Sequence, residues 1–66
     1  MKLNTSTILL IMAEKGLTKS ELAASSGITR QQLSTIIGRG SCMPRTAGKI
    51  AAGLGVPVNK IAKEVV

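Results

Sequence analysis

Two short segments of this chain each carry the residues that begin an α-helix, and a glycine stands between them. Thr18 precedes Glu21 by three residues, and Thr29 precedes Gln32 at the same spacing. In such a capping box the threonine hydroxyl accepts from the third helical N–H, and the longer side chain accepts from the cap's own N–H. Gly27 stands where a chain leaving a helix turns most easily with a positive φ. The pattern therefore predicts two short helices joined by a tight turn.

Capping residues, glycines and the helical spacing of apolar residues predict a helix before this pair. They also predict where the second helix of the pair ends. The first helix is expected from about Thr5 to Lys15, with Asn4 or Thr5 as its cap and Gly16 at its end. The second helix of the pair is expected over residues 30–37. Residues 38–41, Gly-Arg-Gly-Ser, are expected to form a loop.

Prolines open two further helices. Pro44 suits the first position of a fourth helix, where its missing N–H has no helical partner, and Gly55 ends that helix. Pro57 then opens a short fifth helix, which carries Val58, Ile61, Ala62 and Val65. Short connections between helices favour a compact all-α bundle of five helices without strands. Residues 1–66 are expected to be a single domain, with the two-helix motif at about 18–38.

The first helix has apolar residues around its whole circumference. Ile8 and Met12 are expected to pack inward, so that one or two of Leu9, Leu10 and Ile11 are left exposed or covered by something else. If these residues form an exposed apolar patch, the patch suits the binding of a partner. If helix ends and chain termini cover them, no such surface remains.

The helices of the pair are expected to bury different residue types. Leu22 and Ala23 should point inward, and Ala24 and Ser25 are small enough for a close crossing with another helix. In the following helix one face carries Leu33, Ile36 and Ile37.

Composition excludes several classes of function. A net charge of +6 indicates a polyanionic partner. The absence of aromatic residues argues against base-stacking platforms for single strands. Without histidine, and with a single cysteine, there is no plausible zinc site or Ser-His or Cys-His catalytic pair. We therefore expect no enzyme activity, metal, cofactor or small-molecule ligand.

The chain gives no sign of a membrane or export segment. The apolar run over residues 8–13 is too short to cross a bilayer. The lone Cys42 suits a reducing cytoplasm, so a cytoplasmic protein is expected. A cationic membrane-active peptide is disfavoured, because the basic residues form no long stripe opposite an apolar one.

Helix, glycine turn and capped helix form the geometry that places a second helix in the major groove of DNA. Over residues 17–58 the chain resembles the phage repressor and Cro-like (Xre-type) helix-turn-helix family. The segments that carry the resemblance are residues 17–23 (Leu-Thr-Lys-Ser-Glu-Leu-Ala), 27–33 (Gly-Ile-Thr-Arg-Gln-Gln-Leu), 44–45 (Pro-Arg), 50–51 (Ile-Ala) and 54–58 (Leu-Gly-Val-Pro-Val). The resemblance implies a five-helix, lambda repressor-like domain that binds double-stranded operator half-sites as a homodimer and regulates transcription. It also implies a nucleoid-associated protein of prokaryotic or phage origin.

In such a family the second helix of the pair, residues 30–37, is the recognition helix, and its N-terminus should face the major groove. Base contacts are therefore expected from the exposed side of this helix. Arg30 and Gln31 occupy its first two positions and suit guanine and adenine edges respectively. Ser34 and Thr35 lie about one turn further along, and the Thr35 methyl could pack on a thymine methyl. A solvated polar face without base contacts is the alternative.

Phosphate contacts are expected from basic and polar residues around that helix. The resemblance implies a phosphate contact by Lys19 at the N-terminus of the preceding helix and by Arg39 and Arg45 around the following loop. Further candidates are Lys49, one turn beyond Arg45, and Gln32 as a secondary role beside its capping bond. Cys42 departs from the polar or basic residue that relatives often carry in this loop.

Two functions remain open. The first is a small Cro-like repressor that occupies operator DNA. The second is an antitoxin or other protein-interaction subunit, in which the apolar first helix or the C-terminus binds a partner protein and DNA binding is autoregulatory.

Overall fold

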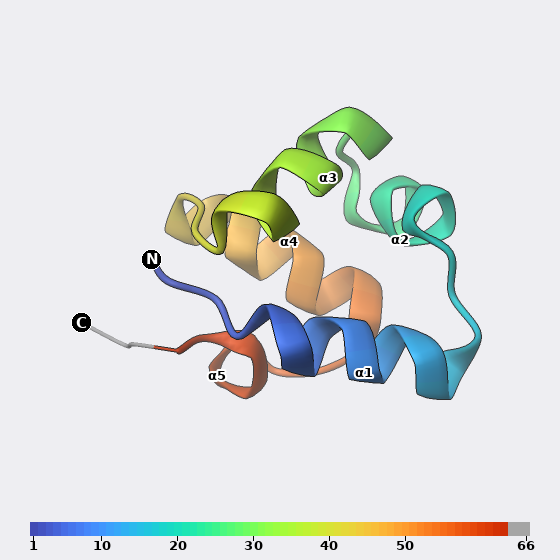
Figure 1. Ribbon diagram of the computed structural model, residues 1–66, viewed down its shortest axis with the longest axis horizontal. Coiled ribbons are helices and arrows are strands. Elements are labelled where there is room, and N and C mark those ends of the chain that lie inside the picture. The colour runs from blue at the N-terminus through green and yellow to red at the C-terminus, as the bar shows by residue number, and fades with distance from the viewer. Residues whose placement is uncertain (64–66) are drawn as a thin grey trace.

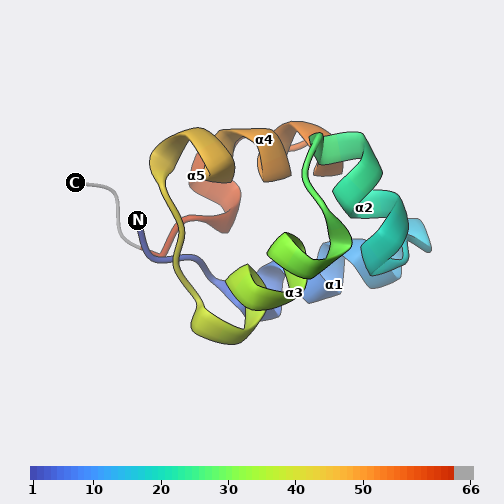
Figure 2. The ribbon, with the colours of Figure 1, turned by 90° about the horizontal axis from the view of Figure 1, so that it is seen from above.

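The computed structural model describes residues 1–63, which form five helices around a common core (Figure 1). The helices are α1 (Thr5–Lys15), α2 (Lys19–Ser26), α3 (Arg30–Arg39), α4 (Pro44–Leu54) and α5 (Val58–Ile61). In Figure 1, α3 lies along one edge of the molecule, and α1 and α5 lie along the opposite edge. The view from above shows α2 at one end, beside α4 (Figure 2). The expected all-α architecture is confirmed.

The helix ends follow the cap residues closely. Asn4, and not Thr5, is the cap of α1, and its Oδ1 accepts from the Thr7 nitrogen at 3.2 Å. Gly16 ends the helix as expected. Pro44 occupies the first position of α4, which also ends as expected, at a C-cap glycine, Gly55.

α3 is longer than its sequence indicated. The helix is expected to end at Ile37 and to be followed by a loop over residues 38–41. This expectation is wrong for Gly38 and Arg39, which are both helical. A glycine in a helix costs only about 1 kcal/mol relative to alanine, so Gly38 weakens the helix without stopping it. Gly40 ends it instead, with φ at 75° and its N–H donating to the Ile36 carbonyl at 2.8 Å.

α5 is shorter than expected, because Ala62 leaves the helix. Ala62 is extended and forms an antiparallel bridge with Leu3, and Lys2 forms a second bridge with Ser41. Residues 1–4, which we call the N-terminal strap, therefore run between the segment after α3 and the segment after α5. No local sequence pattern predicts this pairing. Val65, also expected on α5, lies outside the described residues.

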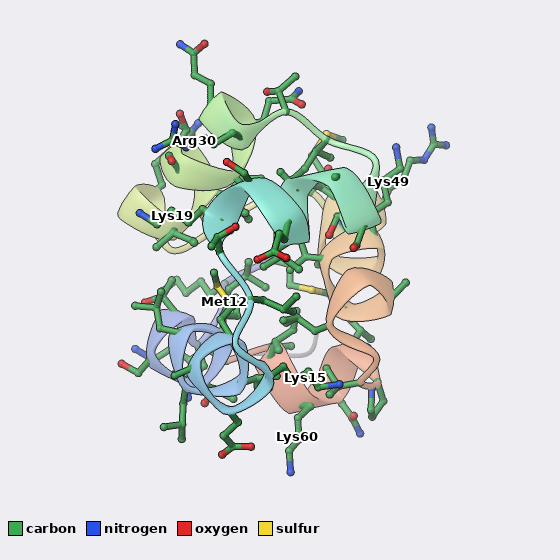
Figure 3. The ribbon with its side chains drawn as sticks, turned by 90° about the vertical axis from the view of Figure 1, so that its right-hand side faces the viewer. Met12, Lys15, Lys19, Arg30, Lys49 and Lys60 are labelled. Carbon is green, nitrogen blue, oxygen red and sulfur yellow. The ribbon has the colours of Figure 1, made fainter. Side chains whose placement is uncertain are left out.

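The core takes residues from every helix. Its largest fully buried side chains are Ile8, Leu22, Leu33, Ile50, Leu54 and Ile61. On α1, Ile8 and Met12 point inward as expected, and Figure 3 shows Met12 in the interior. Ile11 is buried as well, which leaves Leu9 and Leu10 as the exposed pair, at 45% and 61%.

The close crossing of α2 occurs at its C-terminal end, against α4. Ala24 and Ser25 are exposed, so the expectation that they form this crossing is wrong. Ser26 is the buried small residue, and it faces Gly53 of α4. A Cβ at Gly53 would overlap the Ser26 Oγ and would lie 3.2 Å from the Ser26 nitrogen. Two small residues therefore set how closely α2 and α4 approach.

Candidate nucleic-acid interface

The two capping boxes fix the start of α2 and of α3 in the same way. The Thr18 nitrogen donates to Glu21 Oε1 at 2.9 Å, and the Glu21 nitrogen donates to Thr18 Oγ1 at 3.1 Å. The equivalent bonds between Thr29 and Gln32 are 2.9 and 3.0 Å. Gly27 turns the chain between the helices with φ at 73°. This confirms the capped helix-turn-helix geometry.

The four residues expected to contact bases are all exposed on α3. They are Arg30, Gln31, Ser34 and Thr35. Leu33 is the buried residue of this ten-residue helix, and Ile36 and Ile37 are half-buried beside the core. Because its apolar side faces inward, α3 presents a polar side rich in hydrogen-bonding groups to the solvent.

Two polar side chains of α3, Thr35 and Gln32, already have a hydrogen-bond partner in the helix or at its N-cap. The Thr35 hydroxyl donates to the Gln31 carbonyl at 3.0 Å. That bond leaves the methyl group and the oxygen lone pairs of Thr35 for an external contact. Gln32 uses Oε1 in its capping box, so its amide nitrogen keeps two N–H donors.

A surface hollow lies between α3 and the start of α4. Its lining includes five of the nine expected contact residues, Gln31, Gln32, Thr35, Arg39 and Lys49. Arg30, Ser34, Lys19 and Arg45 are exposed but do not line it. The structure therefore brings together part of the base-contacting set and part of the phosphate-contacting set, with the others outside the hollow.

Basic residues occur at two ends of the molecule. Figure 3 shows Lys19, Arg30 and Lys49 at the end where α3 lies, and Lys15 and Lys60 at the other end. Lys15 is near the C-terminus of α4, because its Nζ would lie 3.2 Å from a Cβ at Gly55. This position favours a local role for Lys15, since cations stabilise helix C-termini.

The segment between α3 and α4 contributes residues that the sequence did not single out. Met43, the N-cap of α4, makes no side-chain capping bond, is 73% exposed and lines the hollow. Met1 and Ser41 line it too. Local sequence patterns do not predict a place for Met1 beside the hollow, because Met1 bonds to Cys42, which is 41 positions away in the chain.

Cys42 lies in the same segment and is half-buried. Burial raises the pKa of its thiol above its ordinary value. The neutral thiol is therefore favoured at neutral pH, which argues against a reactive thiolate. Residues 1–63 contain no cluster of three or more His, Cys, Asp or Glu side chains that could hold a metal ion.

The comparison with protein families agrees with this geometry. A helix-turn-helix family model matches residues 8–61, which include all five helices from Ile8 onward. The chain therefore belongs to this helix-turn-helix family, whose members are DNA-binding regulators of the Xre, Cro and C1 type with a lambda repressor-like helical fold. This is a regulatory family and not a family of enzymes. Comparisons with curated proteins and with solved structures gave no match.

Within residues 1–63, no helix is both long enough and apolar enough to cross a membrane.

Proposed function

We propose that this protein is a sequence-specific regulator that reads double-stranded DNA with α3 and represses transcription by occupying operator half-sites as a homodimer. The observation that carries this proposal is the asymmetry of α3. Its apolar side packs on the core, while its exposed side carries side chains that suit base edges. Membership of the helix-turn-helix family supports double-stranded DNA as the ligand.

Arg30 and Gln31 read bases in this proposal. Both lie in the first turn of α3, which Thr29 fixes by its capping bonds, so their backbone positions are preorganised. An arginine can donate two bonds to guanine O6 and N7, and a glutamine can pair with adenine N6 and N7. Each such pair discriminates against a wrong base by about 1–3 kcal/mol.

Ser34 and Thr35 extend base readout along the helix. The Thr35 hydroxyl already donates to the Gln31 carbonyl. Its methyl group is therefore the part that we assign to DNA, in contact with a thymine methyl. Ser34 keeps a rotatable hydroxyl that can donate to or accept from a base edge.

The phosphate backbone is held from both sides of α3. Lys19 is the first residue of α2, where unpaired N–H groups and the helix dipole also attract a phosphate. Arg39 ends α3, and Arg45 and Lys49 lie on the first two turns of α4. The Gln32 amide donors complete this set. Each phosphate neutralised by a basic residue steepens the slope of log affinity against log salt by about 0.9.

One observation favours a second function. Leu9 and Leu10 are exposed on α1, at 45% and 61%, while Ile8, Ile11 and Met12 of the same run are buried. Adjacent exposed leucines suit a contact with another protein. In this second function the chain is an antitoxin-like subunit that binds a partner through α1 and binds DNA to regulate its own expression.

Selection of bound sites from a randomised duplex library at near-physiological salt tests the first proposal. An inverted repeat, with half-site centres about one helical turn apart, is the expected result. A single half-site would support base readout and contradict the dimer. Lys60→Ala is the matched control, because Lys60 is an exposed cation at the end of the molecule away from α3. This variant should select the same sites as the wild type.

Failure to enrich any sequence, with binding that disappears as salt rises, would contradict base readout. A stoichiometric protein partner that is lost in a Leu9→Ser, Leu10→Ser variant would then support the second function.

A further inference from the structure

The N-terminal strap, residues 1–4, is bonded to the segment that follows α3. The Cys42 nitrogen donates to the Met1 carbonyl at 3.0 Å, and the Met1 nitrogen donates to the Cys42 carbonyl at 2.9 Å. The Leu3 nitrogen donates to the Gly40 carbonyl at 2.8 Å. One edge of the strap therefore holds both ends of the segment formed by residues 40–42.

The other edge of the strap is bonded to the chain after α5. The Lys63 nitrogen donates to the Lys2 carbonyl at 2.8 Å, and the Asn4 nitrogen donates to the Ile61 carbonyl at 2.7 Å. The Leu3 side chain is only 3% exposed and belongs to the core. The buried Leu3 side chain and the backbone bonds to residues 61 and 63 thus fix the strap, so that it can act as a support for residues 40–42.

The supported segment forms one wall of the hollow beside α3. Ser41, Cys42 and Met43 line that hollow together with Met1. The segment also joins Arg39, the last residue of α3, to the start of α4. Within residues 1–63, the backbone hydrogen bonds that join residues 40–42 to distant parts of the chain all go to the strap.

We propose that the strap is a positioning element for DNA binding, which holds residues 40–42 in their DNA-bound conformation before DNA arrives. The inference rests on the proposed DNA-binding function. It adds to the binding site a part of the chain that lies outside the helix-turn-helix motif in sequence. A preorganised segment loses less conformational freedom on binding, so it binds more tightly than a mobile one with the same side chains. Leu3 is the residue through which the strap is anchored.

Leu3→Ala tests the proposal, with Leu54→Ala as its matched control. Both leucines are buried, and both changes remove the same atoms from the core. Leu54 lies in the last turn of α4, away from the residues of α4 that line the hollow. Under conditions in which both variants are fully folded, Leu3→Ala should lose roughly tenfold more affinity for the selected site than Leu54→Ala. Equal losses would overturn the proposal.

A reversible cross-link distinguishes positioning from general stability. Lys2 and Ser41 face each other in an antiparallel bridge whose flanking residues make the hydrogen bonds. Such pairs have Cα atoms about 4.5 Å apart, within the range that a disulfide spans. In a Leu3→Ala, Cys42→Ser background, Lys2→Cys and Ser41→Cys should restore affinity when oxidised and not when reduced. Equal affinities of the two forms would contradict the proposal.

Hydrogen exchange gives a readout that needs no substitution. If the strap holds the segment in the complex, the Leu3 and Cys42 amides should exchange more slowly when the selected duplex is bound. Unchanged exchange of these amides, with slowed exchange in α3, would overturn the inference and leave DNA binding intact. A wild-type protein that selects no site would contradict the proposed function itself, so the two failures are distinguishable.

Discussion

α2 and α3 begin and end alike but are used differently by the fold. Each starts with a threonine capping box and ends at a glycine with positive φ. α2 buries three of its eight residues, whereas α3 buries one of ten. Identical end signals therefore fix where a helix forms, and the residues between them decide whether it supports the core or presents a surface. In this comparison α2 is the support and α3 is the presented helix.

The largest effect should come from shortening a core side chain of α2. Leu22 is fully buried, so Leu22→Ala should lower the free energy of unfolding by about 2–5 kcal/mol. Gln31→Ala, on the exposed side of α3, should change it by less than about 0.5 kcal/mol. Urea unfolding followed by circular dichroism measures both. Comparable losses for the two variants would remove the distinction between support and presented helix.

The contact of α2 with α4 should be sensitive to a single methyl group. Gly53→Ala should lower the free energy of unfolding by about 1–3 kcal/mol, because its Cβ would overlap Ser26. Gly48→Ala, in the same helix, has open space around the new Cβ and should raise it by about 1 kcal/mol. The same unfolding measurement applies. A stabilised Gly53→Ala protein would show that this crossing is not close-packed.

Removing either threonine cap should cost the same stability but different amounts of function. Thr18→Ala and Thr29→Ala should each lower the free energy of unfolding by about 1 kcal/mol. Only Thr29→Ala should also reduce discrimination between the selected and a scrambled duplex, because it loosens the first turn of α3, with Arg30 and Gln31. Fluorescence anisotropy on both duplexes measures this. Equal losses of discrimination would assign α2 a role in base readout.

The smallest effect concerns the hydroxyl of Ser26. Its oxygen is buried at the α2–α4 contact and has no hydrogen-bond partner within residues 1–63. Ser26→Ala removes an unpaired polar group and should raise the free energy of unfolding by less than about 1 kcal/mol. Ser25→Ala, at an exposed neighbouring position, is the control and should be near neutral. A destabilised Ser26→Ala protein would indicate a hydrogen bond at this site in solution.

Local chemistry was sufficient to predict most of the fold. Thr18, Thr29 and Gly55 mark helix ends through bonds to residues three or four positions away, and Pro44 marks a helix start because it lacks an N–H. A sequence displays these local signals directly. Sequence signals place the end of α3 too early, because the free-energy cost of Gly38 inside a helix is small. The exposure of Arg30 and Gln31 also followed from the periodicity of Leu33 and its apolar neighbours.

Contacts between distant segments were beyond the reach of these patterns. The pairing of Lys2 with Ser41 and of Leu3 with Ala62 depends on how the helices bring three short segments together. The crossing of Ser26 with Gly53 has the same origin, since Ala24 and Ser25 have equally small side chains and only packing selects among them. The base and phosphate contacts stay predictions, because they concern a ligand and not the fold.

Comparison of Arg30→Ala with Lys19→Ala on a selected and a scrambled duplex over a range of salt tests the central claim most directly. Arg30→Ala should lose about 1–3 kcal/mol of discrimination at one base pair of each half-site, with little change in the salt slope. Lys19→Ala should weaken binding to both duplexes equally and make the slope shallower by about 0.9. If the two variants lose affinity alike on both duplexes, α3 does not read bases and the account is wrong.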